Sequence, residues 1–384
     1  MQQSKADVTA VAVGRRRQGA TRFLFLVAGL ATAAWAALVP DAKARTGLDE
    51  GQLGLVLLCL GIGSILAMPT SGMLSTRYGC RRVLMVCGLV MCLMLPALAM
   101  ASSILPLAIA LFVFGAAIGL FDSVMNIQAI IVERDSGQAL MSGFHGFYSM
   151  GGILGAALAS AIMSGGVPAW QTILLLGAVA VGLLIPGLRH SLDHGNPAEG
   201  PPFAVPRGVV LFLGILCFIV FLSEGAMLDW SGVLLTQAHG FGVEQSGIGF
   251  ACFSVAMTIG RLTGDQVVER LGRTWVVIIG GALAASGIVL ATLVPSWWVA
   301  LFGFGLVGLG CSNIVPVLFT AVGRQTTMPQ QVAVPAMSTL GYAGVLAGPA
   351  GIGFVAHHSS LVIALLMVAV LMAAVAVAGR FLKF

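Results

Sequence analysis

The chain has 384 residues, of which 58% are hydrophobic and only 9% are charged. Because soluble domains carry about 25% charged residues, this composition excludes an ordinary soluble protein. The net charge of +5 does not indicate a nucleic-acid partner, because the basic residues lie at the ends of apolar segments. None of the seven cysteines forms a CxxC pair, so we expect no metal, no redox group and no other cofactor.

Twelve apolar segments fill most of the chain, and a bilayer crossing takes about 20 such residues. In chain order they cover 21–40, 51–75, 82–100, 104–132, 140–165, 168–187, 207–236, 244–268, 274–294, 297–322, 332–356 and 359–382. The polar, basic residues 1–20 are not a cleavable signal and are expected to form a cytoplasmic tail. Residues 189–206, rich in Gly, Pro, His and charge, are predicted to be a cytoplasmic linker between six-helix bundles at 21–188 and 207–384.

Basic residues set the expected orientation. When the chain is drawn as twelve helices that cross the membrane in turn, sixteen Lys and Arg side chains fall on one side of the membrane and only Lys43 and Arg45 on the other. By the positive-inside rule, the rich side is cytoplasmic and holds both termini. Arg261 is left inside the membrane.

The two halves contain weak sequence echoes. Residues 47–54 read GLDEGQLG and residues 242–249 read GVEQSGIG, while 111–115 read LFVFG and 301–305 read LFGFG. Each pair occupies the same place in its half. Such repeats predict an all-α membrane transporter of twelve helices in two pseudo-symmetric bundles, with a site near the midplane.

Two loops carry a family signature. The loop after the second segment contains Gly72, Arg77, Gly79, Arg81 and Arg82, with Thr76 between them. The loop after the eighth segment contains Asp265, Glu269, Arg270, Gly272 and Arg273. Both resemble the hallmark loop GxLxDRxGRR of the major facilitator superfamily, with Thr76 in place of the usual Asp. The resemblance covers essentially the whole chain and implies that both loops act as cytoplasmic gate elements.

Within that superfamily the chain looks most similar to YbjJ-type bacterial inner-membrane transporters, which are distantly fucose-permease-like. The residues that carry this resemblance are Trp35, Pro40, Asp122, Asn126, Phe144, His145, Glu224–Ala226, Asp229–Ser231, Gly341, Tyr342, Gly348 and Pro349. It implies a secondary transporter of the bacterial inner membrane that works as a monomer. The antiporter motif of the fifth helix is only partly present, because Tyr148 stands at its Pro position, so the direction of transport stays open.

Ionisable side chains at bilayer depth are costly and are therefore functional candidates. Asp122 and His145 fall about 16 Å and 10–15 Å from the cytoplasmic end at 1.5 Å per residue, so the two side chains could meet. Such a pair either takes up and releases a proton or forms a fixed hydrogen bond that locks the two helices together. Glu224 is the second main proton candidate. Asp229 lies about 140° around the same helix and is read either as a gate or as a solvated interfacial acid.

Arg261 needs a partner if it is buried. Asp265, one helical turn on, is the simple partner; the sharper hypothesis is a contact with the Asp122 and His145 region that forms in one conformation only. Trp35, Asn126, Trp230, Asn313 and Tyr342 are expected to line a cavity for a polar solute, or else to make ordinary interhelical contacts.

The chain contains no GxxxxGK[ST] motif and no catalytic constellation, so we expect neither an ATP-driven pump nor an enzyme. The leading hypothesis is proton-coupled secondary transport of a small, sugar-like or other polar metabolite. The alternatives are an exporter of amphipathic compounds and a non-transporting membrane receptor or interaction protein.

Overall fold

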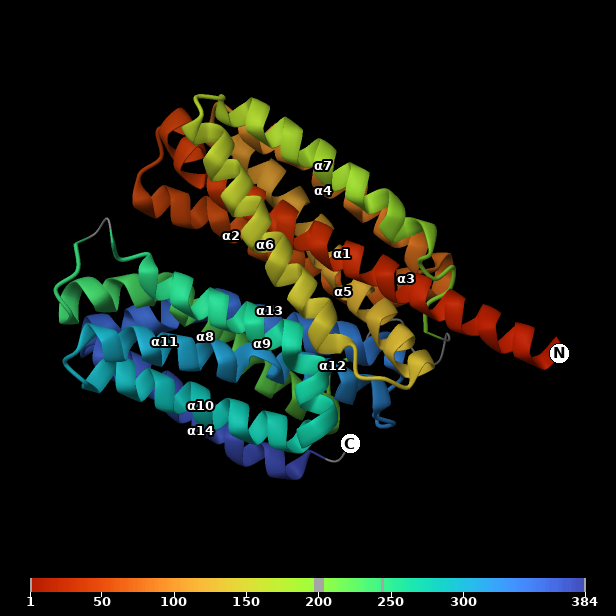
Figure 1. The fold of residues 1–384 in the computed structure, drawn as a ribbon. Coiled ribbons are helices and arrows are strands. Elements are labelled where there is room, and N and C mark those ends of the chain that lie inside the picture. Colours follow the sequence, from red (N-terminus) through yellow and green to blue (C-terminus); the bar gives the residue numbers. More distant parts are fainter. Residues whose placement is uncertain (1, 197–203, 243–244, 383–384) are drawn as a thin grey trace. The chain divides into compact units, whose positions relative to one another are not determined.

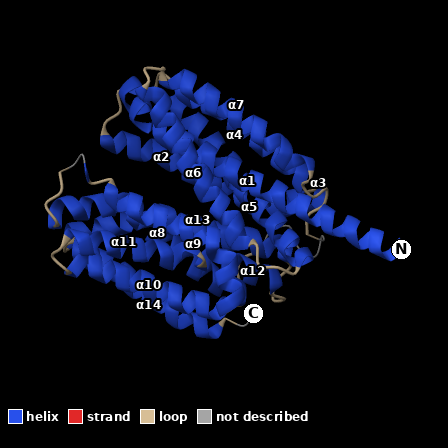
Figure 2. Ribbon diagram, viewed as in Figure 1, coloured by secondary structure: helices blue, strands red, loops and turns tan. Residues whose placement is uncertain are grey.

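The computed structural model describes residues 2–196, 204–242 and 245–382, without the side chains of 2–13 and 50–51. Its regular elements are helices throughout this described part (Figure 2). In the first half these are α1 (Gln2–Thr46), α2 (Glu50–Ala67), η1 (Met68–Thr70), α3 (Ser71–Tyr78), α4 (Cys80–Met100), α5 (Ile104–Ser136), α6 (Met141–Ser164) and α7 (Ala169–Arg189).

The second half contains α8 (Val209–Ala238), α9 (Ile248–Leu271), α10 (Arg273–Leu293), α11 (Trp297–Ser312), α12 (Ile314–Arg324), α13 (Gln330–His358), α14 (Leu361–Ala378) and η3 (Gly379–Phe381). Helix α1 begins far ahead of the first predicted span, and its N-terminal turns extend beyond the neighbouring helices of its own half (Figure 1).

Eleven helical stretches of the described chain are long and apolar enough to cross a membrane. They include α2 continued through α3, and α11 continued through α12, as single spans. The remaining predicted span, the eighth in chain order, is α9. It is long enough to cross a membrane but is less apolar than the others, because it carries Arg261, Asp265, Glu269 and Arg270. The prediction of an all-α fold with twelve membrane helices is therefore confirmed, and the protein is a multi-pass membrane protein.

The chain divides into two compact units. The first consists of residues 1–138, 147–205 and 329–335, and the second of residues 139–146, 206–328 and 336–384. The first residues of α6 thus belong to the second unit, and those of α13 to the first. Each unit is described below by itself.

Glycines let helices within a unit approach closely. In the second unit, a Cβ on Gly287 would lie 2.5 Å from the Gly303 carbonyl oxygen of α11, and a Cβ on Gly303 would meet the Gly287 carbonyl of α10 at the same distance. Contacts of this kind replace the hydrophobic driving force, which is weak between helices in lipid.

Candidate functional site

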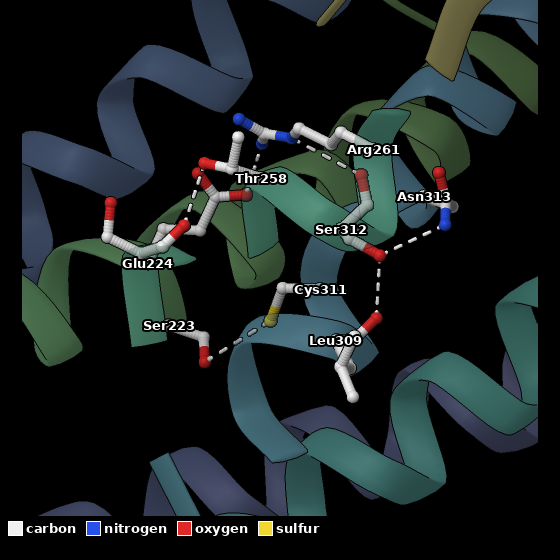
Figure 3. Close-up of polar contacts among 9 residues, drawn as sticks. Ser223, Glu224, Thr258, Arg261, Leu309, Cys311, Ser312 and Asn313 are labelled. Atoms are coloured by element: carbon white, nitrogen blue, oxygen red, sulfur yellow. Dashed lines mark hydrogen bonds and ion pairs between the residues drawn. The ribbon is translucent and has the colours of Figure 1, made fainter. Parts of the chain in front are cut away.

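A buried ion pair lies between α8 and α9 in the second unit. A terminal nitrogen of Arg261 donates to Oε1 of Glu224 at 3.2 Å, and the two side chains are only 7% and 19% exposed. Figure 3 shows the guanidinium turned toward this carboxylate. A buried charge must be paired to be tolerated, and each of these side chains provides the charge that the other needs.

A helix break supplies the second acceptor for Arg261. Nε of Arg261 donates to the main-chain oxygen of Ser312 at 3.3 Å (Figure 3). In a continuous helix this oxygen would accept from the N–H of residue 316, but Pro316 has no N–H and its ring crowds that carbonyl. The span accordingly ends α11 at Ser312 and starts α12 at Ile314, with Pro316 in the first turn of α12, where proline is tolerated.

Asn313 stands at the break itself. Its Nδ2 donates to the Gly260 carbonyl and to the Ser312 hydroxyl, both at 3.0 Å, and that hydroxyl donates to the Leu309 carbonyl at 2.6 Å. Its Oδ1 is buried without a hydrogen bond among the described groups. The amide therefore ties the broken span to α9 immediately beside Arg261.

Three further polar side chains, Ser223, Thr258 and Cys311, lie near the ion pair (Figure 3). The Cys311 thiol donates to the Ser223 hydroxyl at 4.0 Å, and the Thr258 hydroxyl donates to the Ser254 carbonyl at 2.8 Å (Figure 3). Ser223 and Cys311 are fully buried. A carboxylate, a guanidinium, a thiol and hydroxyls are thus gathered where α8, α9 and the broken span meet (Figure 3).

The segment 139–146 packs on α9 within the same unit. The Gly143 N–H donates to Oδ1 of Asp265 at 3.0 Å, so this carboxylate caps the first turn of α6. A Cβ on Gly146 would lie 3.1 Å from the Leu262 nitrogen, next in sequence to Arg261. His145 is buried, with its ring 5.7 Å from that of Phe319.

Replacing Asp265 by alanine should remove this cap and cost about 0.5–2 kcal/mol, the usual value of an N-cap. Asp265→Asn should cost less, because its side-chain oxygen still accepts the Gly143 N–H. Amide hydrogen exchange of residues 141–146 and the thermal unfolding midpoint measure the effect. If the alanine and asparagine variants match wild type in both, the cap does not hold this segment.

In the first unit, Asp122 and Asn126 form the predicted pair on one face of α5. Nδ2 of Asn126 donates to the Asp122 carbonyl at 2.9 Å and lies 3.4 Å from its Oδ2. Asn126 is fully buried, and its Oδ1 has no hydrogen bond among the described groups. Trp35 on α1 is also buried. A meeting of Asp122 with His145 or Arg261 remains a prediction.

Other predicted residues lie apart from the ion pair. Asp229 is exposed, one turn beyond Glu224, while Nε1 of the neighbouring Trp230 is buried without a hydrogen bond in the described part. The Tyr342 ring packs edge-on against Phe221 with centroids 6.0 Å apart. Of the predicted gate residues, Arg77, Arg82, Glu269, Arg270 and Gly272 are exposed.

Sequence reasoning singled out Glu224 and Arg261 separately but did not pair them. It named Asp265 as the simple partner of Arg261; in the structure Arg261 pairs with Glu224, and Oδ1 of Asp265 accepts the Gly143 N–H. Sequence reasoning also missed the helix break and the Ser312 carbonyl as an acceptor for Arg261, although Pro316 was the residue that could have predicted the break.

Comparisons with known proteins give a consistent result. The family model described as Major Facilitator Superfamily matches residues 23–234, more than half of the chain. An uncharacterized MFS-type transporter of Yersinia pestis is 50% identical over 98% of both chains. Membrane protein MosC of Rhizobium meliloti is 31% identical over 98% of this chain and 90% of its own length.

Among solved structures, the fucose:proton symporter FucP of E. coli superposes with a TM-score of 0.80 and covers 96% of this chain and 98% of its own. Its sequence is only 15% identical, so this likeness concerns the fold.

Proposed function

This chain belongs to the major facilitator superfamily and is a membrane transporter, and from that premise we propose that it moves a small polar solute by proton-coupled alternating access. In such transporters one repeat rocks against the other around a site near the midplane. We also propose that the protein works as a monomer in a bacterial inner membrane, with both termini in the cytoplasm, as the distribution of its basic residues suggests.

The observation that carries this proposal is the ion pair of Glu224 and Arg261 inside two membrane helices. A purely structural helix pair would not need two charges there, because apolar residues of similar volume serve stability equally well or better. A carboxylate held by a guanidinium is suited to take up a proton when the pair separates and to release it when the pair forms again.

Asp122 is the proposed second titrating group. It is half-buried on α5 and bonded to Asn126, which retains an unused acceptor atom. Unused hydrogen-bonding atoms on buried amides suit a solute that carries hydroxyl or amine donors. That chemistry favours a polar metabolite over a purely hydrophobic compound.

A thermal-shift screen of the purified protein tests the proposal. Sugars, sugar acids, amino acids and amphipathic drugs are added at about pH 5.5 and pH 8. A true ligand at 100 times its Kd should stabilise the fold by about 2.7 kcal/mol, whatever the direction of transport. We expect a polar hit whose shift changes with pH in wild type and loses that change in Asp122→Asn or Glu224→Gln.

Each other outcome is informative. Hits only among amphipathic cations would replace the proposal by an exporter of such compounds. A polar hit with the same shift at both pH values in wild type would retain the solute class and remove proton coupling. Absence of counterflow with every ligand that binds would indicate a receptor.

A further inference from the structure

The stretch that follows α7 does not leave the first unit at once. Residues 190–196, here called the strap, run along the start of α4. The Cys80 N–H donates to the His194 carbonyl at 3.4 Å and the Arg81 N–H to the Leu192 carbonyl at 2.8 Å. The first N–H groups of a helix have no partner within it, and the N-cap Gly79 offers no side chain. Main-chain oxygens of the strap therefore cap α4.

Arg81 fastens the strap a second time. Its guanidinium donates to the Leu188 carbonyl at 2.9 Å and to the Arg189 carbonyl at 3.0 Å, and it pairs with Asp193 at 2.9 Å. The two carbonyls belong to the last turn of α7, whose final C=O groups also lack partners within the helix. One side chain thus joins the end of α7, the strap and the start of α4.

The strap is also hydrogen-bonded to α5. Its Leu192 N–H donates to Oε1 of Gln128 on α5 at 3.1 Å, and Nε2 of Gln128 donates to the Thr21 hydroxyl on α1 at 3.1 Å. Leu192 is 2% exposed, as expected for a core residue. The strap therefore has hydrogen-bond or ion-pair partners on α4 and α5, and its Ser191 hydroxyl donates to the Gly187 carbonyl of α7 at 2.7 Å.

Thr76, which stands where the family has an acid, binds the far end of the strap. Its hydroxyl donates to the Asn196 carbonyl at 2.8 Å. Nearby, the main chains touch: a Cβ on Gly195 would lie 2.6 Å from the Ser75 carbonyl group, and a Cβ on Gly79 would strike the Asp193 carbonyl. Both sites need glycine for this close approach.

The corresponding turn of the second half has a different neighbour, because the Thr274 hydroxyl on α10 donates to the Leu382 carbonyl after α14 at 3.5 Å. Gly272, before α10, has φ 79° and ψ 153°, against 79° and 154° at Gly79 before α4. Nevertheless a Cβ on Gly272 would meet nothing within 4 Å. There, the position of Thr76 is taken by Glu269, which is exposed. The turn is thus built twice with the same glycine conformation, and among the described residues a neighbouring main chain lies directly against the glycine at Gly79 but not at Gly272.

We propose that the strap is a fixed part of the first unit that holds the α3–α4 turn in place, and that Thr76 is the residue that adapts this loop to the strap. Residues 190–196 of the predicted linker then move with the first unit. This inference does not rest on the identity of the solute or of the coupling ion.

Amide hydrogen exchange of the full-length protein in lipid nanodiscs tests the proposal. In wild type, the Cys80, Arg81 and Leu192 amides should exchange as slowly as those in the middle of α4. In Gly195→Ala the added methyl group has no room, so the strap should lift and these three amides should exchange at least about fivefold faster. Gly182→Ala is the matched control, because Gly182 on α7 has open space around its Cβ position.

A second variant removes a single contact. Thr76→Val keeps the shape of the side chain but deletes its hydroxyl, and should speed exchange of the same amides about 2- to 10-fold, the range of one hydrogen bond. Rapid exchange of the Leu192 amide in wild type would overturn the proposal. So would unchanged exchange of Cys80 and Arg81 in either variant.

Discussion

Arg261→Gln is expected to destabilise the folded protein by about 3–5 kcal/mol, because it leaves the Glu224 carboxylate buried without its cation. The substitution also removes the donor to the Ser312 carbonyl, which Pro316 cannot replace. The midpoint and steepness of thermal unfolding, followed by circular dichroism in detergent, measure the loss.

Two variants isolate the cause. Arg270→Gln removes the same charge from the same helix at an exposed position and should have little effect. Adding Glu224→Gln to Arg261→Gln should recover part of the lost stability, because no buried carboxylate is then left unpaired. If the two single effects simply add in the double variant, the ion pair does not couple these residues, and the site described above loses its basis.

The helix inventory was predictable because a membrane span is a property of local composition. About 20 apolar residues in a row predict a crossing wherever they occur, and the twelve ranges lie close to the observed helices. Even α9, the least apolar of them, was found, because its charges lie at one end apart from Arg261.

Partnerships within the site were less predictable. Arg261 needed an acid, but Glu224 is 37 residues away in the chain and Asp265 only one turn. Which acid it meets depends on how α8 and α9 are rotated about their axes. Hydrophobic periodicity says little about that rotation, because the surface that faces lipid is as apolar as the surface that faces other helices.

The strap illustrates a different limit. Residues 190–196 read as part of a polar linker because residues 189–206 are rich in Gly, Pro, His and charge, a composition typical of connections. Their binding to α4 depends on main-chain carbonyls, which every residue has and no sequence pattern displays. Thr76 in the position of an acid was the visible sign that this loop differs from its relatives.

Glu224→Gln is expected to abolish proton-driven accumulation while leaving solute exchange intact. Glutamine keeps the size of the side chain and a carbonyl oxygen for Arg261, but it cannot bind and release a proton. In proteoliposomes, a carrier that moves one proton per solute can concentrate the solute about tenfold per pH unit. The ligand found by thermal shift is used as the solute, with an imposed pH gradient for accumulation and equal pH on both sides for counterflow.

The control for this variant is Asp135→Asn, which removes an exposed acid from the end of α5 and should retain both activities. Loss of counterflow together with accumulation in Glu224→Gln would assign Glu224 to solute binding rather than to coupling. Full accumulation in Glu224→Gln would leave Asp122 as the proposed proton carrier, and the corresponding Asp122→Asn variant would then be expected to lose the gradient-driven step. The two substitutions therefore show whether the coupled proton binds to Glu224 on α8 of the second unit or to Asp122 on α5 of the first.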